Sequence, residues 1–473
     1  MTKIIFGTDG WRAVISREFT FDNVRYVAVA ATEYFQRVGK GKPVTVGYDR
    51  RFLSREYAEE VAQVATAKDL KIILSDDVCS TPAISLETIR RKAVGGVMIT
   101  ASHNPGQYNG IKIKGPFGGP VGSDVTQGIQ DRANALLEHG KSPQMLSLEE
   151  ARKQKRLQFF SPKKRYLDEI SSHVDITRIK RLKPRVVVDA MYGSGVGLLA
   201  PLLESWGLPT KEIHGETNPS FGGLNPEPIG KNLEPLCRAV KEANADIGFA
   251  LDGDADRIGV VDHRGEWLTT QDVFALLLMH AVEDLKLTGE IVKTCSSTSM
   301  LDKLCRMYGL LLHETPVGFK YVADLMLERN ALLGGEESGG YALRGHIPER
   351  DGSMAALFLL QMMAMRKQPL SNILDSLYRK VGYHAFRRDD LRLPKEKMAE
   401  VLDMLKNRPL KTIAGRSVER ILTVDGFKFF LSDGSWLLLR PSGTEPLFRV
   451  YVEAPSENAV DEILKKAKRQ LLR

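Results

Sequence analysis

Three aspartates at alternate positions form the densest group of potential metal ligands in the sequence. Asp252, Asp254 and Asp256 directly follow the apolar stretch Ile247–Leu251. On an extended backbone, alternate side chains point to the same side, so the three carboxylates can converge on one cation. Oxygen ligands without Cys or His favour Mg²⁺ or Ca²⁺ over zinc. The segment predicts a site for a hard divalent cation, and an acidic turn held by its own hydrogen bonds is the alternative.

A serine followed by a histidine ends another apolar stretch. Ser102 and His103 lie in Thr-Ala-Ser-His-Asn-Pro, after Gly96–Ile99, and Lys112 follows a short distance later. A serine hydrolase would favour a Gly-x-Ser-x-Gly turn, which the sequence lacks. A hydroxyl beside a divalent cation can instead carry a phosphoryl group, because the metal screens the charge of the transferring oxygens. We therefore expect Ser102 on a surface loop as a phosphoryl carrier, and a turn-capping serine is the competing interpretation.

A loop near the C-terminus has the composition of an anion-binding site. It reads Arg-Pro-Ser-Gly-Thr-Glu-Pro, it contains Ser442, Gly443 and Thr444, and Arg449 follows it. Small residues leave backbone N–H groups free to point at an anion, and arginines add bidentate donors. The Gly-x-x-x-x-Gly-Lys pattern of nucleotide triphosphatases is absent. The segment predicts a phosphate-binding loop, with a tight turn and a salt bridge as the alternative.

Three further polar segments complete the set. Glu336 and Ser338 lie in Gly-Glu-Glu-Ser-Gly-Gly, and their spacing suits a grip on neighbouring sugar hydroxyls. Gly318 and Lys320 lie in a turn that we expect to be mobile and to present one ammonium group, and Arg12 supplies a cation near the N-terminus. Each segment alone would be interpreted as a polar loop, so their significance lies in the combination.

The Ser102, Asp252 and Glu336 motifs each follow a predicted strand in a chain of alternating strands and helices. Strands are predicted at 44–46, 71–74 and 96–99, at 186–188 and 247–251, and at 291–292 and 331–333. Such alternation is typical of βαβ units with parallel strands. Ligands in these sheets lie beyond the carboxyl ends of the strands. We therefore expect three similar mixed α/β domains whose loops converge on one central cleft.

The last part of the chain follows a different pattern. Strands are predicted at 417–424, 428–431, 435–439 and 448–452, and a final helix places Val460, Ile463, Leu464, Ala467 and Leu471 on one face. This order predicts a smaller α+β domain. The expected domains are 1–160 with the serine loop, 161–266 with the metal loop, 267–383 with the sugar loop and 384–473 with the phosphate loop.

Composition limits the classes of protein to consider. The chain has 473 residues, 43% of them apolar and 27% charged, which fits about three or four globular domains. Its apolar stretches are too short for the ~20 residues of a membrane span, and the N-terminus lacks the pattern of a signal peptide. Four cysteines without C-x-x-C spacing suit a reducing cytoplasm. The sequence leaves open whether the protein is a monomer or a homodimer.

The net charge of +8 requires an anionic partner to be considered. A basic protein can bind nucleic acid, a membrane surface or a small anionic substrate. The densest basic run, residues 152–165, is predicted to be a solvated linker. We expect a small anionic substrate as the partner, with no nucleic acid and no membrane, because nucleic-acid binding would explain this run but none of the four loops.

Taken together, the motifs resemble the α-D-phosphohexomutase superfamily of phosphoglucomutases, phosphomannomutases and phosphoglucosamine mutases. The resemblance rests on Thr-Ala-Ser-His-Asn-Pro, Asp-Gly-Asp-Ala-Asp-Arg, Gly-Glu-Glu-Ser-Gly and Arg-Pro-Ser-Gly-Thr-Glu-Pro, which occur in the order typical of the family and cover nearly the whole chain. Ala255 stands where the family pattern often has Gly, a change of little consequence.

The resemblance implies a role for each motif. Ser102 would be the phosphoserine, and it would hold Mg²⁺ together with the three aspartates. The sugar hydroxyls would contact Glu336 and Ser338. The distal phosphate would be held by Arg440, Ser442, Gly443, Thr444 and Arg449. The residues expected near the reacting groups are Arg12, His103, Lys112, Arg257 and Lys320, with Lys112 and His103 as candidates for the acid or base.

The implied reaction interconverts a hexose 1-phosphate and a hexose 6-phosphate. Phosphorylated Ser102 would give its phosphoryl group to the sugar, and the resulting hexose 1,6-bisphosphate would turn over and return its other phosphate. The glucosamine branch typically has Gly-Glu-Gln-Ser-Gly-His, from which Glu337 and Gly340 depart. We therefore expect glucose first and mannose second. A phosphoglucosamine mutase and a metal-dependent sugar phosphatase remain alternatives.

Overall fold

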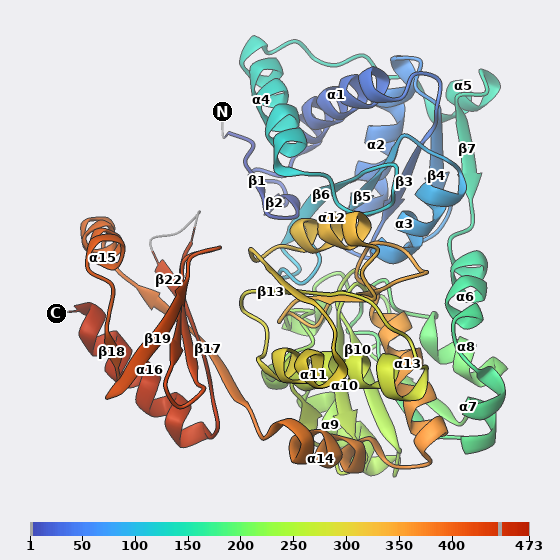
Figure 1. Cartoon of the computed structure of the whole chain (residues 1–473). Coiled ribbons are helices and arrows are strands. Elements are labelled where there is room, and N and C mark those ends of the chain that lie inside the picture. The colour runs from blue at the N-terminus through green and yellow to red at the C-terminus, as the bar shows by residue number, and fades with distance from the viewer. Residues whose placement is uncertain (1–2, 443–446, 473) are drawn as a thin grey trace.

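The computed structural model describes residues 3–442 and 447–472 of the chain. Four β-sheets follow one another along the sequence. Figure 1 shows the C-terminal sheet and its helices to one side of the other three. This arrangement confirms the predicted fold class, three mixed α/β domains followed by a smaller α+β domain. The domain boundaries and the central cleft stay predictions.

The first sheet has seven strands in the order β1-β2-β6-β5-β3-β4-β7. Its strands are β1 (Phe6–Gly7), β2 (Gly10–Val14), β3 (Val44–Tyr48), β4 (Ile72–Ser75), β5 (Gly95–Ile99), β6 (Tyr108–Lys114) and β7 (Leu157–Phe160). Its helices are α1 (Phe21–Val38), α2 (Ser54–Ala67), α3 (Thr81–Arg90), α4 (Ser123–His139) and α5 (Leu148–Lys153). In α2 the apolar residues Tyr57, Val61 and Val64 are buried, as their helical spacing predicts.

The second sheet has five strands in the order β12-β11-β10-β8-β9. Its strands are β8 (Val186–Asp189), β9 (Thr210–Ile213), β10 (Ile247–Leu251), β11 (Ile258–Asp262) and β12 (Trp267–Leu268). The helices in this part of the chain are α6 (Lys163–Ser172), α7 (Ile176–Leu182), α8 (Leu199–Ser205) and α9 (Glu234–Glu242). Since β12 pairs with β11, this sheet continues slightly beyond residue 266.

The third sheet has four strands in the order β14-β13-β15-β16. Its strands are β13 (Ile291–Thr294), β14 (Leu312–Thr315), β15 (Leu333–Gly335) and β16 (Tyr341–Leu343). The helices are α10 (Thr270–Met279), α11 (Met300–Tyr308), α12 (Phe319–Arg329), α13 (Gly352–Arg366) and α14 (Leu370–Val381). A π-helical turn at His280–Asp284 extends α10.

In each of these three sheets, the strand before the motif pairs antiparallel with the strand that follows the motif. β5 pairs antiparallel with β6, β10 with β11, and β15 with β16. The Ser102, Asp252 and Glu336 loops are therefore equivalent connections. The sequence predicted parallel βαβ units but not the antiparallel return, because β6 contains the lysines of Tyr-Asn-Gly-Ile-Lys-Ile-Lys, which do not look like a buried strand.

The fourth sheet has six strands in the order β17-β22-β21-β20-β19-β18. They are β17 (Ala385–Arg392), β18 (Thr412–Ile413), β19 (Arg416–Leu422), β20 (Phe427–Leu431), β21 (Trp436–Pro441) and β22 (Leu447–Ala454). Two helices, α15 (Lys395–Asn407) and α16 (Glu457–Leu472), accompany it. All five apolar residues predicted to share one face of α16 are buried in the core of this domain.

The basic run at 152–165 is not a simple linker, contrary to the sequence-based expectation. It contains the end of α5, the strand β7, which pairs in parallel with β4, and the start of α6. Three of its lysines form ion pairs, Lys153 with Glu149 at 2.6 Å, Lys163 with Asp77 at 2.9 Å and Lys164 with Asp168 at 3.0 Å. The charged residues on either side concealed this short strand, and its side chains Gln158 and Phe159 are exposed at the edge of the sheet.

One apolar core joins the first three domains. It contains Ile73 and Met98 from the first, Val186 and Phe249 from the second and Leu333 from the third. The C-terminal domain has its own core. No helix within residues 3–442 and 447–472 has the length and apolar character that crossing a bilayer would require.

Candidate active site

The Ser102 loop is held from beneath by a buried arginine. Arg51 donates to the carbonyl oxygens of Ser102 at 2.6 Å, Asn104 at 2.5 Å and Pro105 at 2.8 Å. Asp49, at the end of β3, pairs with Arg51 at 3.2 Å. Ser102 itself has a left-handed backbone with a φ of 52°, and it is fully buried. The expectation of a surface serine was therefore wrong, because the metal loop covers it.

The three aspartates converge as predicted. One carboxylate oxygen of each of Asp252, Asp254 and Asp256 lies within 4.8 Å of the others, and all three residues are buried. The Ser102 hydroxyl donates to Asp252 Oδ2 at 3.0 Å. Asp254 Oδ1 and Asp256 Oδ1 are buried oxygens without a hydrogen-bond partner in the described part of the chain. Such oxygens fit a hard cation, because burial without a partner costs free energy.

The serine and metal loops are in direct contact. A Cβ at Gly253 would lie 2.3 Å from the Ser102 carbonyl oxygen, so no larger residue fits there. Thr81, at the start of α3, donates from its hydroxyl to Asp254 Oδ2 at 2.5 Å and from its backbone to the Asp254 carbonyl at 2.9 Å. The first domain therefore fixes the position of a carboxylate that the second domain supplies.

Lys112 lies among carboxylates. Its Nζ contacts Asp254 Oδ2 at 2.8 Å, Asp256 Oδ2 at 2.9 Å and Asp9 Oδ2 at 2.9 Å. Burial alone would lower the pKa of Lys112, but these carboxylates outweigh burial and hold that pKa above its ordinary value. The side chain is therefore an ammonium group that neutralises the cluster.

A second cation, Arg350, connects the third domain to the same cluster. Its guanidinium lies 2.8 Å from Asp9, 2.8 Å from Asp256 and 3.3 Å from Glu336. Burial would raise the pKa of Asp9, but Lys112 and Arg350 hold it well below the ordinary value. Asp9 and Arg350 thus join all three domains at one point.

His103 and Arg12 lie at the edge of this cluster. His103 Nδ1 is 3.4 Å from Ser102 Oγ. Burial, and then the cations Arg257, Arg12 and Lys112, lower the pKa of His103 well below its ordinary value, so the imidazole is neutral near pH 7. Arg12 donates to the Asn104 side chain at 3.0 Å.

Arg257 lies on the other side of the metal loop. Its guanidinium is 3.9 Å from Asp256 and 3.6 Å from Glu227. Burial would lower its pKa, but the carboxylates of Asp256 and Asp252 raise it above the ordinary value. Its charge lies next to the carboxylates and is available to a phosphate.

The Glu336 loop contains a carboxyl group and a hydroxyl group that can each form further hydrogen bonds. Burial raises the pKa of the Glu336 carboxyl to about 7, although Arg350 opposes this shift. The Ser338 hydroxyl is buried and has no hydrogen-bond partner among the described residues. The neighbouring Glu337 instead accepts from Ser296 Oγ at 2.7 Å and from Thr294 Oγ1 at 3.2 Å, so it belongs to the scaffold of the loop.

Gly318 and Lys320 mark the start of α12. Gly318 has a φ of 138°, which glycine adopts readily. Lys320 is buried, and its Nζ donates to Ser123 Oγ at the start of α4 at 2.7 Å. The segment is therefore the beginning of a helix that touches the first domain. Its expected role in substrate binding stays a prediction.

The loop predicted to bind phosphate begins at the end of β21, and Arg449, also predicted to bind phosphate, lies on β22. Arg440 pairs with Asp425 at 2.6 Å, and Asp425 also accepts from the backbone of Val317 at 3.0 Å. Arg449 lies opposite Arg440 in the pairing of β21 with β22, and its Nε is buried without a partner in residues 3–442 and 447–472. Ser442 donates from its backbone to Leu447 at 2.9 Å. The remaining predicted residues, Gly443 and Thr444, lie outside the described residues.

The structure thus brings together Ser102, His103, Lys112, the three aspartates and Glu336. It adds residues that sequence reasoning missed, namely Asp9, Arg51 and Arg350. A usable signal existed for Arg51, because Asp-Arg-Arg directly follows the strand β3. Asp9 and Arg350 carried no such signal, since their contact joins segments more than 300 residues apart.

Family models match nearly the whole chain. Those for phosphoglucomutase/phosphomannomutase alpha/beta/alpha domains I, II and III match residues 3–139, 164–265 and 270–381. The model for the phosphoglucomutase/phosphomannomutase C-terminal domain matches residues 387–470.

Individual proteins are similar to this chain over nearly their full lengths. The chain is 31% identical to a phosphoglucomutase/phosphomannomutase of Thermococcus kodakarensis, with 97% of this chain and 96% of the relative covered. It is 33% identical to a phosphoglucosamine mutase of Bradyrhizobium sp. strain ORS 278, covering 98% and 97%. The crystal structure of a protein assigned as a phosphomannomutase, from Thermus thermophilus, superposes with a TM-score of 0.87 at 31% identity and covers 100% of both chains.

Proposed function

The chain belongs to the phosphoglucomutase/phosphomannomutase family of the α-D-phosphohexomutase superfamily and is a mutase, and from this premise we propose that it interconverts hexose 1-phosphate and hexose 6-phosphate through a phosphorylated Ser102. The observation that carries the proposal is the contact of the Ser102 hydroxyl with Asp252 at 3.0 Å, beside two buried carboxylate oxygens without partners among the described residues. A nucleophilic hydroxyl and a cation site thus share one position.

The reaction consists of two transfers in opposite directions. In the first, the bond between phosphorus and Ser102 Oγ breaks and a sugar hydroxyl bonds to the phosphorus. That hydroxyl loses its proton, and Ser102 Oγ takes one up. The product is a hexose 1,6-bisphosphate. In the second transfer the other phosphoryl group bonds to Ser102 Oγ, which loses its proton, and the sugar oxygen that the group leaves takes up a proton. Phosphate is conserved, so a small amount of bisphosphate suffices to prime the enzyme.

Ser102, Asp252, Asp254 and Asp256 fit Mg²⁺, because they offer oxygen ligands and two of these oxygens accept no hydrogen bond in the described part of the chain. When bound, the ion supplies charge neutralisation for the oxygens of the transferring phosphoryl group. Lys112 contacts Asp254 Oδ2, and Arg350 contacts Asp256 Oδ2. These contacts orient the two carboxylates and leave the Oδ1 atoms for the ion.

The proton of the sugar hydroxyl requires a base close to the transferring group. His103 is our candidate, because it lies 3.4 Å from Ser102 Oγ and its lowered pKa keeps it neutral. Lys112, the other candidate, is held as an ammonium group by three carboxylates in this structure. It suits a role as the acid or as a positioning residue. Arg12 and Arg257 add positive charge for the phosphoryl oxygens.

The third and fourth domains would bind the end of the substrate that lies away from Ser102. Glu336 would accept a hydrogen bond from one sugar hydroxyl, and Ser338 would donate a hydrogen bond to an adjacent one. The substrate's second phosphate would contact Arg440, Ser442, Gly443, Thr444 and Arg449, with Lys320 and Gly318 at the neighbouring turn. Backbone donors and arginines bind phosphate without contacting the groups that distinguish one sugar from another. Such donors suit a loop that must accept the bisphosphate in both orientations.

The preferred sugar is proposed as glucose, with mannose second, because the sugar loop reads Glu-Glu-Ser. Glucosamine is a second candidate, since a relative at 33% identity is named phosphoglucosamine mutase. The four cysteines are all free thiols, which is consistent with the proposed cytoplasmic location.

One assay tests both the reaction and the sugar. The 1-phosphates of glucose, mannose and glucosamine would each be incubated with Mg²⁺ and a catalytic amount of glucose 1,6-bisphosphate. Formation of 6-phosphate and of free phosphate would be followed together. We expect 6-phosphate with free phosphate near background, and the highest kcat/KM for glucose. Release of one free phosphate per sugar consumed would identify a phosphatase and overturn the proposal.

A further inference from the structure

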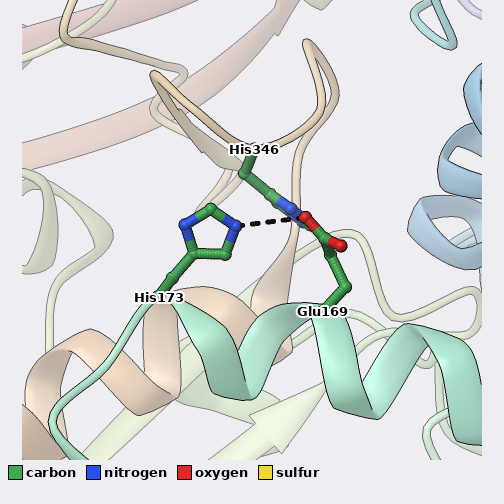
Figure 2. Close-up of side chains that lie close together, drawn as sticks. All are labelled: Glu169, His173 and His346. Carbon is green, nitrogen blue, oxygen red and sulfur yellow. Dashed lines mark hydrogen bonds and ion pairs between the residues drawn. The ribbon is translucent and has the colours of Figure 1, made fainter.

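We propose that Glu169, His173 and His346 form a second metal site, separate from the aspartate cluster. This site would bind a transition-metal cation, and Zn²⁺ is the preferred ion. Figure 2 shows Glu169 and His173 on one helix and His346 reaching toward them from a loop above. One ligand atom from each residue lies within 4.8 Å of the others. Two imidazoles and one carboxylate are a ligand set that zinc accepts, with water in the fourth position.

Two of the ligands are already spaced for a tetrahedral ion. Glu169 and His173 lie one turn apart on α6 and its C-cap, and Glu169 Oε1 is 3.3 Å from His173 Nε2. Two ligands about 2.0 Å from a tetrahedral zinc are about 3.3 Å from each other. The pair can therefore bind zinc with little movement of either side chain. Both are partly exposed, with 31% and 22% of their side-chain surface accessible, so an ion can enter from solvent.

The third ligand is a buried histidine with one unused nitrogen. The His346 side chain is 1% exposed, and its ring lies 5.3 Å from that of His173, measured between centroids. His346 Nδ1 is buried and has no hydrogen-bond partner among the described residues. A buried ring nitrogen without a partner is costly unless something binds it. A cation between the two imidazoles would satisfy it.

The other nitrogen of His346 is fixed by a carboxylate. His346 Nε2 is 2.9 Å from Asp351 Oδ2. Asp351 in turn accepts from the Tyr166 hydroxyl at 2.7 Å and from the Met354 backbone at 2.9 Å, so its position is determined. A carboxylate that accepts Nε2–H leaves the lone pair on Nδ1, which is the tautomer that a metal requires. Metal-bound histidines commonly have such a carboxylate partner.

The ion would connect two parts of the chain that meet near the active site. α6 follows the last strand of the first sheet, whereas His346 lies in the loop between β16 and α13. The same loop contains Glu349, which pairs with Lys114, and Arg350, which contacts Asp9 and Asp256. A cation at the base of this loop is thus placed to stabilise it. We assign the site a structural role, because no catalytic group identified above belongs to its ligands.

Zinc binding to the intact protein tests this site without an activity assay. The Asp254→Asn variant serves as the background, because it weakens binding of zinc at the aspartate cluster. Metal-free protein would be titrated with Zn²⁺ against a chromogenic chelator in the presence of Mg²⁺. We expect one zinc ion per chain. Binding of Co²⁺ should give the visible absorption of a tetrahedral site with nitrogen and oxygen ligands.

Removing a partly exposed ligand should weaken this binding without disturbing the fold. His173→Asn and Glu169→Gln, each in the same background, should weaken zinc binding by more than about tenfold, since even the loss of a partner outside the ligand shell costs that much. The matched control is His313→Asn, which removes another half-exposed His–Glu pair, the 2.6 Å contact with Glu290. It should leave zinc affinity unchanged.

Activity then separates the two metal sites. His173→Asn in the otherwise wild-type chain should retain full Mg²⁺-dependent mutase activity, because His173 does not touch the site proposed for the reaction. The inference is overturned if the Asp254→Asn protein binds no zinc, or if its zinc affinity is the same with and without His173. These results would leave the proposed function untouched.

Discussion

The region around Ser102 and the region around Arg440 are built in opposite ways. Ser102 and the three aspartates are buried among contacts from three domains that share one apolar core. Arg440 lies on a fourth domain that has a core of its own. The fourth domain meets the third through a small apolar cluster that includes Cys295, Trp436 and Tyr451.

Polar contacts also cross this junction. Glu453 accepts from the Ser299 hydroxyl at 2.7 Å and from His384 at 2.9 Å, and from Trp436 Nε1 of its own sheet at 3.0 Å. Burial would raise the pKa of Glu453, but the hydrogen bond and charge of His384, and then hydrogen bonds from Thr298 and Ser299, lower it to about 2. Lys428 pairs with Glu314 at 2.8 Å. The fourth domain is therefore attached by defined contacts and does not share the common core.

The difference matches the two tasks of a mutase. Phosphoryl transfer needs groups held in fixed geometry, because catalysis depends on their orientation toward the transition state. Binding of the other phosphate needs charge and backbone donors but must tolerate two orientations of the sugar. We therefore expect substitutions near Ser102 to affect the chemical step and substitutions near Arg440 to affect substrate binding.

The largest effect is expected at the nucleophile. Ser102→Ala removes one hydroxyl and leaves the left-handed backbone and its carbonyl contacts with Arg51 in place. Turnover should fall to background, because no phosphoryl carrier remains. Activity would be measured with glucose 1-phosphate and bisphosphate primer, with circular dichroism as the control for folding. Retention of wild-type activity by the folded variant would refute the assignment of Ser102.

The next effect concerns the carboxylates. Asp254→Asn preserves the size of the side chain but replaces an anionic ligand, so kcat should fall by several orders of magnitude. EDTA should abolish the activity of the wild-type enzyme, and addition of Mg²⁺ should restore that activity. If chelation leaves activity unchanged, the aspartates serve the structure alone, and the contrast between the two regions loses its basis.

A smaller effect is expected at the fourth domain. Arg440→Ala removes a charge-assisted contact worth about 1.5–3 kcal/mol, so kcat/KM should fall by roughly ten- to several-hundredfold for glucose and mannose alike. Arg416, which pairs with Asp433 and Glu462 on the same domain, provides the control substitution Arg416→Ala. A large shift in the glucose-to-mannose ratio in Arg440→Ala would show that this region reads the sugar.

The smallest effect is a pH dependence at Glu336. Its pKa of about 7 means that the carboxyl is protonated below that pH and ionised above it. If the ionised form grips the sugar hydroxyls, kcat/KM should rise as pH increases through about 7, and Glu336→Gln should remove this rise. The folded protein binds this proton more tightly than the unfolded chain, so its contribution to stability falls as pH rises from about 4.5 to 7. An unchanged pH profile in Glu336→Gln would exclude Glu336 as its origin.

Sequence patterns predicted the parts of this protein that depend on local order. Apolar strands ending in polar motifs placed the Ser102, Asp252 and Glu336 loops correctly, because the strand and its loop are adjacent in the chain. The helical spacing of Val460 and Ile463 predicted the buried face of α16 for the same reason.

The rest depended on contacts between distant segments. Lys112 and Lys114 lie on a buried strand, which their charge argues against, and only the carboxylates of other segments make their burial possible. The burial of Ser102 likewise results from the approach of Gly253, a residue of the second domain. Asp9 contacts Arg350, which lies 341 residues further along the chain. Patterns within a short window contain no information about such pairs.

The central claim is that Ser102 gives its phosphoryl group to one position of the sugar and takes back the group at the other position. It is tested most directly by a single turnover. Phosphorylated enzyme, verified by intact mass and by peptide mapping to Ser102, would be mixed with an equal amount of glucose 6-phosphate and Mg²⁺ and quenched at intervals. We predict that each phosphoryl group lost from Ser102 early in the reaction appears in glucose 1,6-bisphosphate, with free phosphate at background. Appearance of that group as free phosphate, or transfer from an enzyme whose phosphate lies on another residue, would contradict the claim.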